Sequence, residues 1–231
     1  KGTRITLKDL RSEPVGPKSY TFYFEGGISA YVRHIAKNKA FFNDPPMYAE
    51  KENDGILVEV ALAYTDDFNE HVFAFANNIH TQEGGTHLTG FRSAVTRAIN
   101  EFGKNAGYLK EEQFSGDDVR EGLTAVISVK IKNPQFEGQT KARLGNPEVR
   151  TVVEQVLTEA LSYYFEEHPQ EARAIIEKCL LSFRARLAAK AARETVIRKG
   201  ALDGMTLPGK LADCTEKDPA KSELFIVEGD S

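Results

Sequence analysis

The chain has 231 residues, of which 41% are hydrophobic and 10% aromatic, and this composition excludes a disordered chain, a collagen-like repeat and a mini-protein. Thirty Lys and Arg against 34 Asp and Glu give a net charge of -4, which excludes a histone-like protein covered in positive charge. Apolar stretches such as Ile175-Ile176 are much shorter than a bilayer span, and no signal-peptide pattern opens the chain, so we expect a cytoplasmic protein without membrane contact.

The first third of the chain predicts strands around a short helix. Apolar residues at helical spacing predict the helix at residues 28–37. The turn signal Thr65-Asp66-Asp67 predicts that the second and third strands form an antiparallel hairpin. The strands are expected at residues 19–24, at 55–64 after the Pro45-Pro46 loop, and at 71–76.

The middle of the chain predicts a helix followed by a strand. Apolar positions from Phe91 to Phe102 predict a helix that ends near Gly103 or Gly107. Alternation over residues 123–131 predicts a half-buried strand, and a loop follows at residues 136–145.

Two helices are predicted next. Asn146-Pro147-Glu148 combines a capping side chain with a proline in the first turn and an early carboxylate, so it predicts a helix start. Pro169 ends that helix and opens a second one that meets no Gly or Pro before Gly200. The order of elements predicts an α/β (α+β) domain with an antiparallel or mixed sheet and helices on one face.

Two short motifs are candidates for anion binding. Gln139-Thr140-Lys141 lies in a predicted loop, where it is either a solvated polar loop or a phosphate contact made by an amide and an ammonium group. Gly84-Gly85-Thr86-His87 precedes a helix but lacks the P-loop arrangement, and a tight turn that lets strand and helix pack is the favoured interpretation.

Charged residues on the helices have two possible meanings. Arg92 and Arg97 are either solvated or contact phosphates. Residues 170–199 carry eight Lys and Arg against three Glu, so this helix is either a solvated face or a contact with a phosphate backbone. The five histidines lack metal-ligand spacing, and Cys179 and Cys214 are expected to be free thiols. Glu228, after the strand-like run 224–227, is a weak candidate metal ligand.

Eight motifs in order resemble the B subunits of bacterial DNA gyrase, with the B subunits of topoisomerase IV as the close rival. The motifs are Tyr23-Phe24-Glu25-Gly26-Gly27, Asn77-Asn78-Ile79, Glu83-Gly84-Gly85-Thr86-His87 with Gly90-Phe91-Arg92, Asp117 to Leu123, Gln139-Thr140-Lys141, Arg198 to Leu202, Leu207 to Cys214, and Val227-Glu228-Gly229-Asp230-Ser231.

The resemblance implies three parts. Residues 1–168 resemble a transducer domain related in fold to ribosomal protein S5 domain 2. Residues 169–200 resemble a long basic helical arm, and residues 201–231 resemble the truncated start of a Toprim domain. A GHKL-type ATPase domain of the same chain would precede them, so we expect a piece of a longer protein that is inactive alone.

The resemblance also implies roles for particular residues. Gln139 and Lys141 resemble a loop that contacts the γ-phosphate of ATP, and Arg92 resembles an arginine facing the cavity through which DNA passes. Glu228 resembles the Toprim glutamate, which binds Mg²⁺ and supports DNA cleavage by a tyrosine of the A subunit in an A2B2 enzyme. The basic residues of the arm are expected DNA contacts, namely Arg184, Arg186, Lys190 and Arg193.

The expected function is therefore to couple ATP binding and hydrolysis to strand passage and negative supercoiling. The alternatives are the B subunit of a decatenating topoisomerase IV, a non-catalytic DNA-binding scaffold built on the basic arm, and a mismatch-repair or chaperone ATPase with a similar second domain. The ending Glu228-Gly229-Asp230-Ser231 argues against this last alternative, because those proteins do not continue into Toprim.

Overall fold

The computed structural model describes residues 2–11, 16, 18–110, 112–204, 216 and 218–223, and the side chains of 196–204 are not described. The chain divides into two compact units, residues 1–185 and residues 186–231. The central sheet and both candidate sites belong to the first unit.

The helices and strands follow the order predicted for an α/β chain. The strands are β1 (Arg4–Lys8), β2 (Ser19–Tyr23), β3 (Met47–Asn53), β4 (Ile56–Tyr64), β5 (His71–Ala76), β6 (Ile79–His80), β7 (Leu123–Lys130), β8 (Phe136–Glu137) and β9 (Arg143–Leu144). The helices are α1 (Gly27–Ile35), α2 (Thr86–Asn105), α3 (Gly116–Arg120), α4 (Pro147–Glu167), α5 (Pro169–Gly204) and the 3-10 turn η1 (Pro219–Lys221).

The central sheet is mixed, with the strand order β3-β4-β7-β5-β6. The predicted hairpin between the strands at 55–64 and 71–76 is wrong, because β7 lies between β4 and β5. Val126 of β7 is opposite Ala61 of antiparallel β4 and opposite Phe73 of parallel β5. Two strand spacings amount to about 10 Å, and the connection between β4 and β5 is long enough to span them.

Strand β3 was not predicted. Pro45-Pro46 indicated a loop there, but the strand begins at the next residue and pairs with β4 in an antiparallel hairpin. Asp54 and Gly55 form its turn with φ angles of 51° and 73°. This is the Asp-Gly signal of a tight hairpin, which needs positive φ at both central residues.

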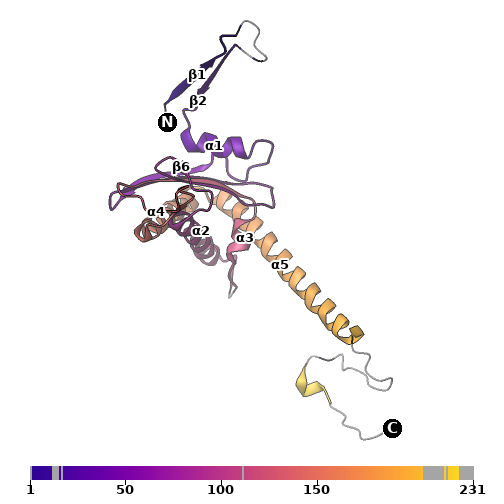
Figure 1. Cartoon of the computed structure of the whole chain (residues 1–231). Coiled ribbons are helices and arrows are strands. Elements are labelled where there is room, and N and C mark those ends of the chain that lie inside the picture. Colours follow the sequence, from indigo (N-terminus) through magenta and orange to yellow (C-terminus); the bar gives the residue numbers. More distant parts are fainter. Residues whose placement is uncertain are drawn as a thin grey trace. The chain divides into compact units, whose positions relative to one another are not determined.

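The sheet is covered on both faces. Alternate residues of β4 point to a large core shared with α2, α4 and the first half of α5, whereas Ala61 and Ala63 belong to a smaller cluster with Val32 of α1. In Figure 1, α1 lies on the side of the sheet opposite α2 and α4. The predicted mixed sheet with a helical layer on one face is confirmed, and α1 is an additional cover on the other face. Strand β7 is consequently buried from Leu123 to Val129, rather than half-buried.

Helix α5 begins at Pro169 as predicted and continues through Gly200 to Gly204. Its first half is part of the core, since Ile175, Ile176 and Cys179 are fully buried there. The first compact unit extends to residue 185 and so includes this half of the helix. The predicted strand at 224–227, Glu228 and Cys214 lie outside the described residues.

Candidate functional site

The Gln139-Thr140-Lys141 motif forms the tip of a small hairpin. Strands β8 and β9 pair antiparallel on either side of it, and the Gln139 and Lys141 side chains are exposed. Lys141 has a φ of 55°, a left-handed conformation that costs a non-glycine residue about 1 to 2 kcal/mol. The Lys141 ammonium lies 5.8 Å from the centre of the Phe136 ring. Both polar side chains are therefore available to a group outside this unit.

The base of this hairpin is bonded to the segment that opens helix α2. The Glu83 amide donates to the Ala142 carbonyl (3.0 Å), and the Leu144 amide donates to the Gly84 carbonyl (3.1 Å). Gly85 has a φ of 132°, and a Cβ atom there would lie 2.3 Å from the Leu144 carbonyl oxygen. The interpretation of the Gly84-Gly85 pair as a tight turn that permits close packing is confirmed, and the backbone it approaches is that of the hairpin.

Asn146 fixes the other side of the hairpin. It was predicted to cap α4, but its side chain makes no capping hydrogen bond. The side chain instead accepts from the Gln135 amide (2.6 Å) and donates to the Asn133 carbonyl (3.2 Å) and to Glu148 Oε1 (2.8 Å). The prediction of a helix start at this point is correct, while the side chain serves the preceding loop.

His87, the last residue of the glycine motif, is buried and neutral. The Thr81 hydroxyl donates to the Ala74 carbonyl (2.9 Å) and lies 3.1 Å from His87 Nε2, so Nε2 carries the proton that the hydroxyl accepts. His87 Nδ1 has no hydrogen-bond partner among the described residues. Burial lowers the pKa of His87 to about 4, because a charged imidazolium would be poorly solvated there. The buried, neutral imidazole thus lies at the start of α2, hydrogen-bonded to Thr81.

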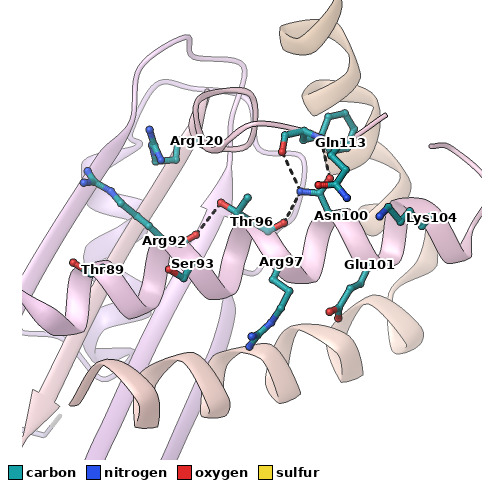
Figure 2. A pocket seen from close by; sticks show the side chains of 11 residues that line it. Thr89, Arg92, Ser93, Thr96, Arg97, Asn100, Glu101, Lys104, Gln113 and Arg120 are labelled. Atoms are coloured by element: carbon teal, nitrogen blue, oxygen red, sulfur yellow. Dashed lines mark hydrogen bonds between the residues drawn. The ribbon is translucent and has the colours of Figure 1, made fainter. Parts of the chain in front are cut away.

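Helix α2 lines a basic pocket of about 720 Å³. Figure 2 shows Arg92, Arg97 and Lys104 on α2, with Arg120 of α3 near Arg92 and with Arg97 directed to the other side of the helix. The other lining residues are Thr89, Ser93, Thr96, Asn100, Glu101, Gln113 and Phe114. Four cations against one carboxylate, among hydroxyl and amide groups, make a surface suited to phosphates. We refer to it as the α2 pocket.

The arginines of the α2 pocket have internal partners. Arg92 donates through Nε (3.0 Å) and Nη2 (2.7 Å) to the two oxygens of Glu70. Arg120 Nε lies 3.7 Å from Glu70 and the same guanidinium pairs with Asp117. Arg97 pairs with Glu154 of α4 at 2.8 Å. The sequence allows Arg92 to be a solvated charge or a phosphate contact, and the structure shows it in a two-point ion pair.

The sequence did not indicate Arg120 as a pocket residue, because its place depends on tertiary contacts. Helix α3 begins with a capping box between Ser115 and Asp118. Asn100 of α2 binds the segment before it, accepting from the Phe114 amide (2.8 Å) and donating to its carbonyl (3.1 Å). Arg92 and Arg97 are five residues apart, about 140° around the helix, so their spacing did not indicate one wall of a pocket, and nothing local indicated Arg120.

The remaining predicted site residues belong to α5 and to the C-terminal part of the chain. Arg184, Arg186, Lys190 and Arg193 are exposed on α5, and Glu228 lies outside the described residues. Among the residues that the structure describes, no three His, Cys, Asp or Glu side chains form a metal-binding group. None of the described helices is long and apolar enough to cross a membrane.

Comparison with known proteins identifies the family. The family model for DNA gyrase B matches residues 27–195. The chain is 51% identical to the DNA gyrase B protein of Clostridium acetobutylicum over 234 residues, with 100% of this chain and 36% of that protein covered. For the DNA gyrase B protein of Streptococcus pneumoniae the identity is 52% over 233 residues, with the same shares covered.

This chain is also similar to a solved structure, both in sequence and in fold. The 43K ATPase domain of Thermus thermophilus gyrase B, in complex with an aminocoumarin, is 39% identical with a TM-score of 0.75, covering 83% of this chain and 51% of that chain. The chain thus spans about a third of the length of the two curated relatives, 36% in each case. On the match to more than half of its residues, the chain belongs to the DNA gyrase B family.

Proposed function

We propose that this chain is the part of a gyrase B protein that senses the γ-phosphate of ATP and relays its presence to a DNA-contacting surface. The observation that carries the proposal is the hydrogen-bonded connection between the Gln139-Lys141 loop and the start of α2, the helix that lines the α2 pocket. The proposed γ-phosphate contact and the proposed DNA-facing surface would thereby be connected through the start of α2.

The loop fits a nucleotide supplied from outside this unit. Gln139 contributes an amide donor and Lys141 an ammonium group, and both are exposed beyond the last paired residues of the hairpin. A charged hydrogen bond to phosphate contributes about 1.5 to 3 kcal/mol. Such a contact is made to a triphosphate and not to a diphosphate, so the loop would have different energies in the two states, as a switch requires. We propose that the triphosphate binds to a GHKL-type domain of the same polypeptide.

The cations of the α2 pocket would contact the backbone of the transported duplex. Its cations match a phosphate backbone in charge, and they contact phosphates without reading the base sequence. Arg92 is the predicted contact, and Arg97, Lys104 and Arg120 extend the same surface. The exposed Arg184, Arg186, Lys190 and Arg193 of α5 supply a second basic surface, for which we propose the same partner.

The whole enzyme would be an ATP-dependent type IIA topoisomerase that introduces negative supercoils, a DNA-breaking isomerase built with gyrase A proteins. We propose transducer, helical arm and Toprim roles for residues 1–168, 169–200 and 201–231. Glu228 would hold Mg²⁺ there through its carboxylate, the type of ligand that this ion prefers. Cleavage needs the gyrase A protein, so this chain is expected to be inactive alone.

Supercoiling distinguishes this function from that of topoisomerase IV. The intact gyrase B protein, assembled with gyrase A, should introduce negative supercoils into relaxed plasmid in the presence of ATP. Lys141→Ala should lose most of this activity, whereas Arg143→Ala, which removes a cation from the same hairpin, should retain it. Decatenation or relaxation without supercoiling would favour topoisomerase IV, and a fully active Lys141→Ala enzyme would refute the role of the loop.

The scaffold alternative predicts a different pattern. If the basic arm alone carried the function, neutralising Arg184, Arg186, Lys190 and Arg193 in the intact enzyme would abolish activity, and Lys141→Ala would have no effect.

The names of the relatives support gyrase over topoisomerase IV.

A further inference from the structure

A carboxylate outside the lining of the α2 pocket, that of Glu70, binds one of its lining arginines. Arg92 binds both Glu70 oxygens, through Nε at 3.0 Å and Nη2 at 2.7 Å, and Arg120 Nε lies 3.7 Å from one of them. This two-point arrangement is the one by which a guanidinium group also binds a phosphate. Glu70 therefore satisfies the same donors that a DNA backbone would use.

The carboxylate is less exposed than the arginine that binds it. The Glu70 side chain is 21% exposed, against 41% for Arg92. Glu70 ends the connection between β4 and β5, whose first residue is bonded to Gly122, since the Thr65 amide donates to the Gly122 carbonyl at 2.9 Å. A Cβ on Gly122 would lie 2.5 Å from the Thr65 carbonyl oxygen, so this connection is packed tightly against the strand. Arg92 reaches Glu70 from α2 through a long side chain that can change partners.

We infer that Glu70 is a built-in competitor for the phosphates of the transported duplex, and that Arg92 and Arg120 exchange between Glu70 and DNA. The inference rests on the proposed function, in which the α2 pocket faces DNA. Each phosphate contact then replaces an existing ion pair, so binding is weaker and less dependent on salt than the number of cations suggests. A surface past which a duplex must move requires weak contacts that are released easily.

Glu101 provides a matched control within the α2 pocket. It lines the α2 pocket and is exposed, and it forms no ion pair with the described residues. Glu70→Gln and Glu101→Gln therefore make the same change in net charge, but only the first removes the two-point ion pair of Arg92 and the longer contact of Arg120, which keeps its pair with Asp117. Both substitutions preserve side-chain size.

The test uses the intact gyrase B protein with gyrase A and measures ATP turnover as a function of linear duplex concentration. Glu70→Gln should lower the half-saturating duplex concentration by about two- to fivefold near physiological salt, as expected for one partly exposed ion pair. It should also steepen the dependence of log affinity on log salt by about 1, as expected for one more phosphate contact. Glu101→Gln should produce a smaller shift and no change of slope.

Three results would count against a competing carboxylate. Equal effects of Glu70→Gln and Glu101→Gln would overturn the inference, because general electrostatics would then be sufficient. In an Arg92→Ala background the effect of Glu70→Gln should fall by at least half, and an undiminished effect would also overturn it. If Arg92→Ala alone leaves DNA affinity unchanged, the DNA-facing role of the pocket fails first, and that result is distinguishable from a failure of the competitor alone.

Discussion

Replacing Gly85 by Ala tests the contact that joins the Gln139-Lys141 loop to helix α2. Gly85 has a φ of 132° and a ψ of -163°, a region that is essentially restricted to glycine and costs other residues about 1 to 3 kcal/mol. The new Cβ would also lie 2.3 Å from the Leu144 carbonyl oxygen. Because the Leu144 carbonyl oxygen belongs to paired backbone, relief of this clash requires a shift of β9. Overpacking of this kind costs about 1 to 3 kcal/mol.

We expect Gly85→Ala to lower the free energy of unfolding by about 2 to 6 kcal/mol in total. Gly107→Ala is the control, because Gly107 also has a positive φ of 77° but no atom within 4 Å of its Cβ position. It should cost only the strain of the left-handed region, about 1 to 2 kcal/mol. The excess cost of Gly85→Ala over this control reports the approach to Leu144 together with the more restricted backbone region of Gly85.

Urea unfolding followed by tyrosine emission is a suitable assay. All eight tyrosines lie between residues 20 and 164 and the chain has no tryptophan, so the emission reports on the first compact unit alone. If Gly85→Ala were no more destabilising than Gly107→Ala, the close contact between the start of α2 and the hairpin would be refuted. The proposed relay from loop to pocket would then lose its structural basis.

Two further predictions concern buried titratable groups. The pKa of His87 is lowered to about 4 in the folded protein, against an ordinary value near 6.5. Between pH 6.5 and pH 4 the proton therefore binds only to the unfolded chain. The free energy of unfolding should fall by up to about 3 kcal/mol as the pH falls through this range. His87→Gln should remove this part of the pH dependence in urea titrations, and an equal loss with the exposed His34→Gln would contradict the assignment. Burial raises the pKa of the Cys179 thiol to about 12. In a Cys214→Ser background, iodoacetamide at pH 8 should therefore label Cys179 only after the protein unfolds. Fast labelling of the native protein would contradict this placement.

Much of the first unit could be predicted because local signals and tertiary structure agree. The helical period of α2 and α4, the alternation of β4 and the proline at the start of α5 all indicated correct elements. Strand pairing was the main error, because the turn signal at Thr65 indicates a change of direction and not the neighbour to which the chain returns. The second, buried face of β7 was missed for a related reason, since the cover provided by α1 comes from a distant part of the chain.

The candidate site divides in the same way. Exposure of Gln139 and Lys141 agrees with the loop that the sequence predicted, and the glycine pair before α2 was correctly interpreted as a close packing contact. What packs against that pair, and which carboxylate binds Arg92, depends on contacts between segments far apart in sequence. Asn146 illustrates the ambiguity of a local motif, because the same side chain suits a helix cap or a loop and the structure uses it for the loop.

The central claim is that Lys141 distinguishes a triphosphate from a diphosphate. The most direct test measures the affinities of ATP and ADP for the intact gyrase B protein and for its Lys141→Ala and Arg143→Ala variants. A γ-phosphate contact worth about 1.5 to 3 kcal/mol predicts that Lys141→Ala lowers the preference for ATP over ADP by about 10- to 100-fold, with ADP affinity and the Arg143→Ala control unchanged. An unchanged preference, or an equal loss of affinity for both nucleotides, would contradict the claim that this loop senses the γ-phosphate.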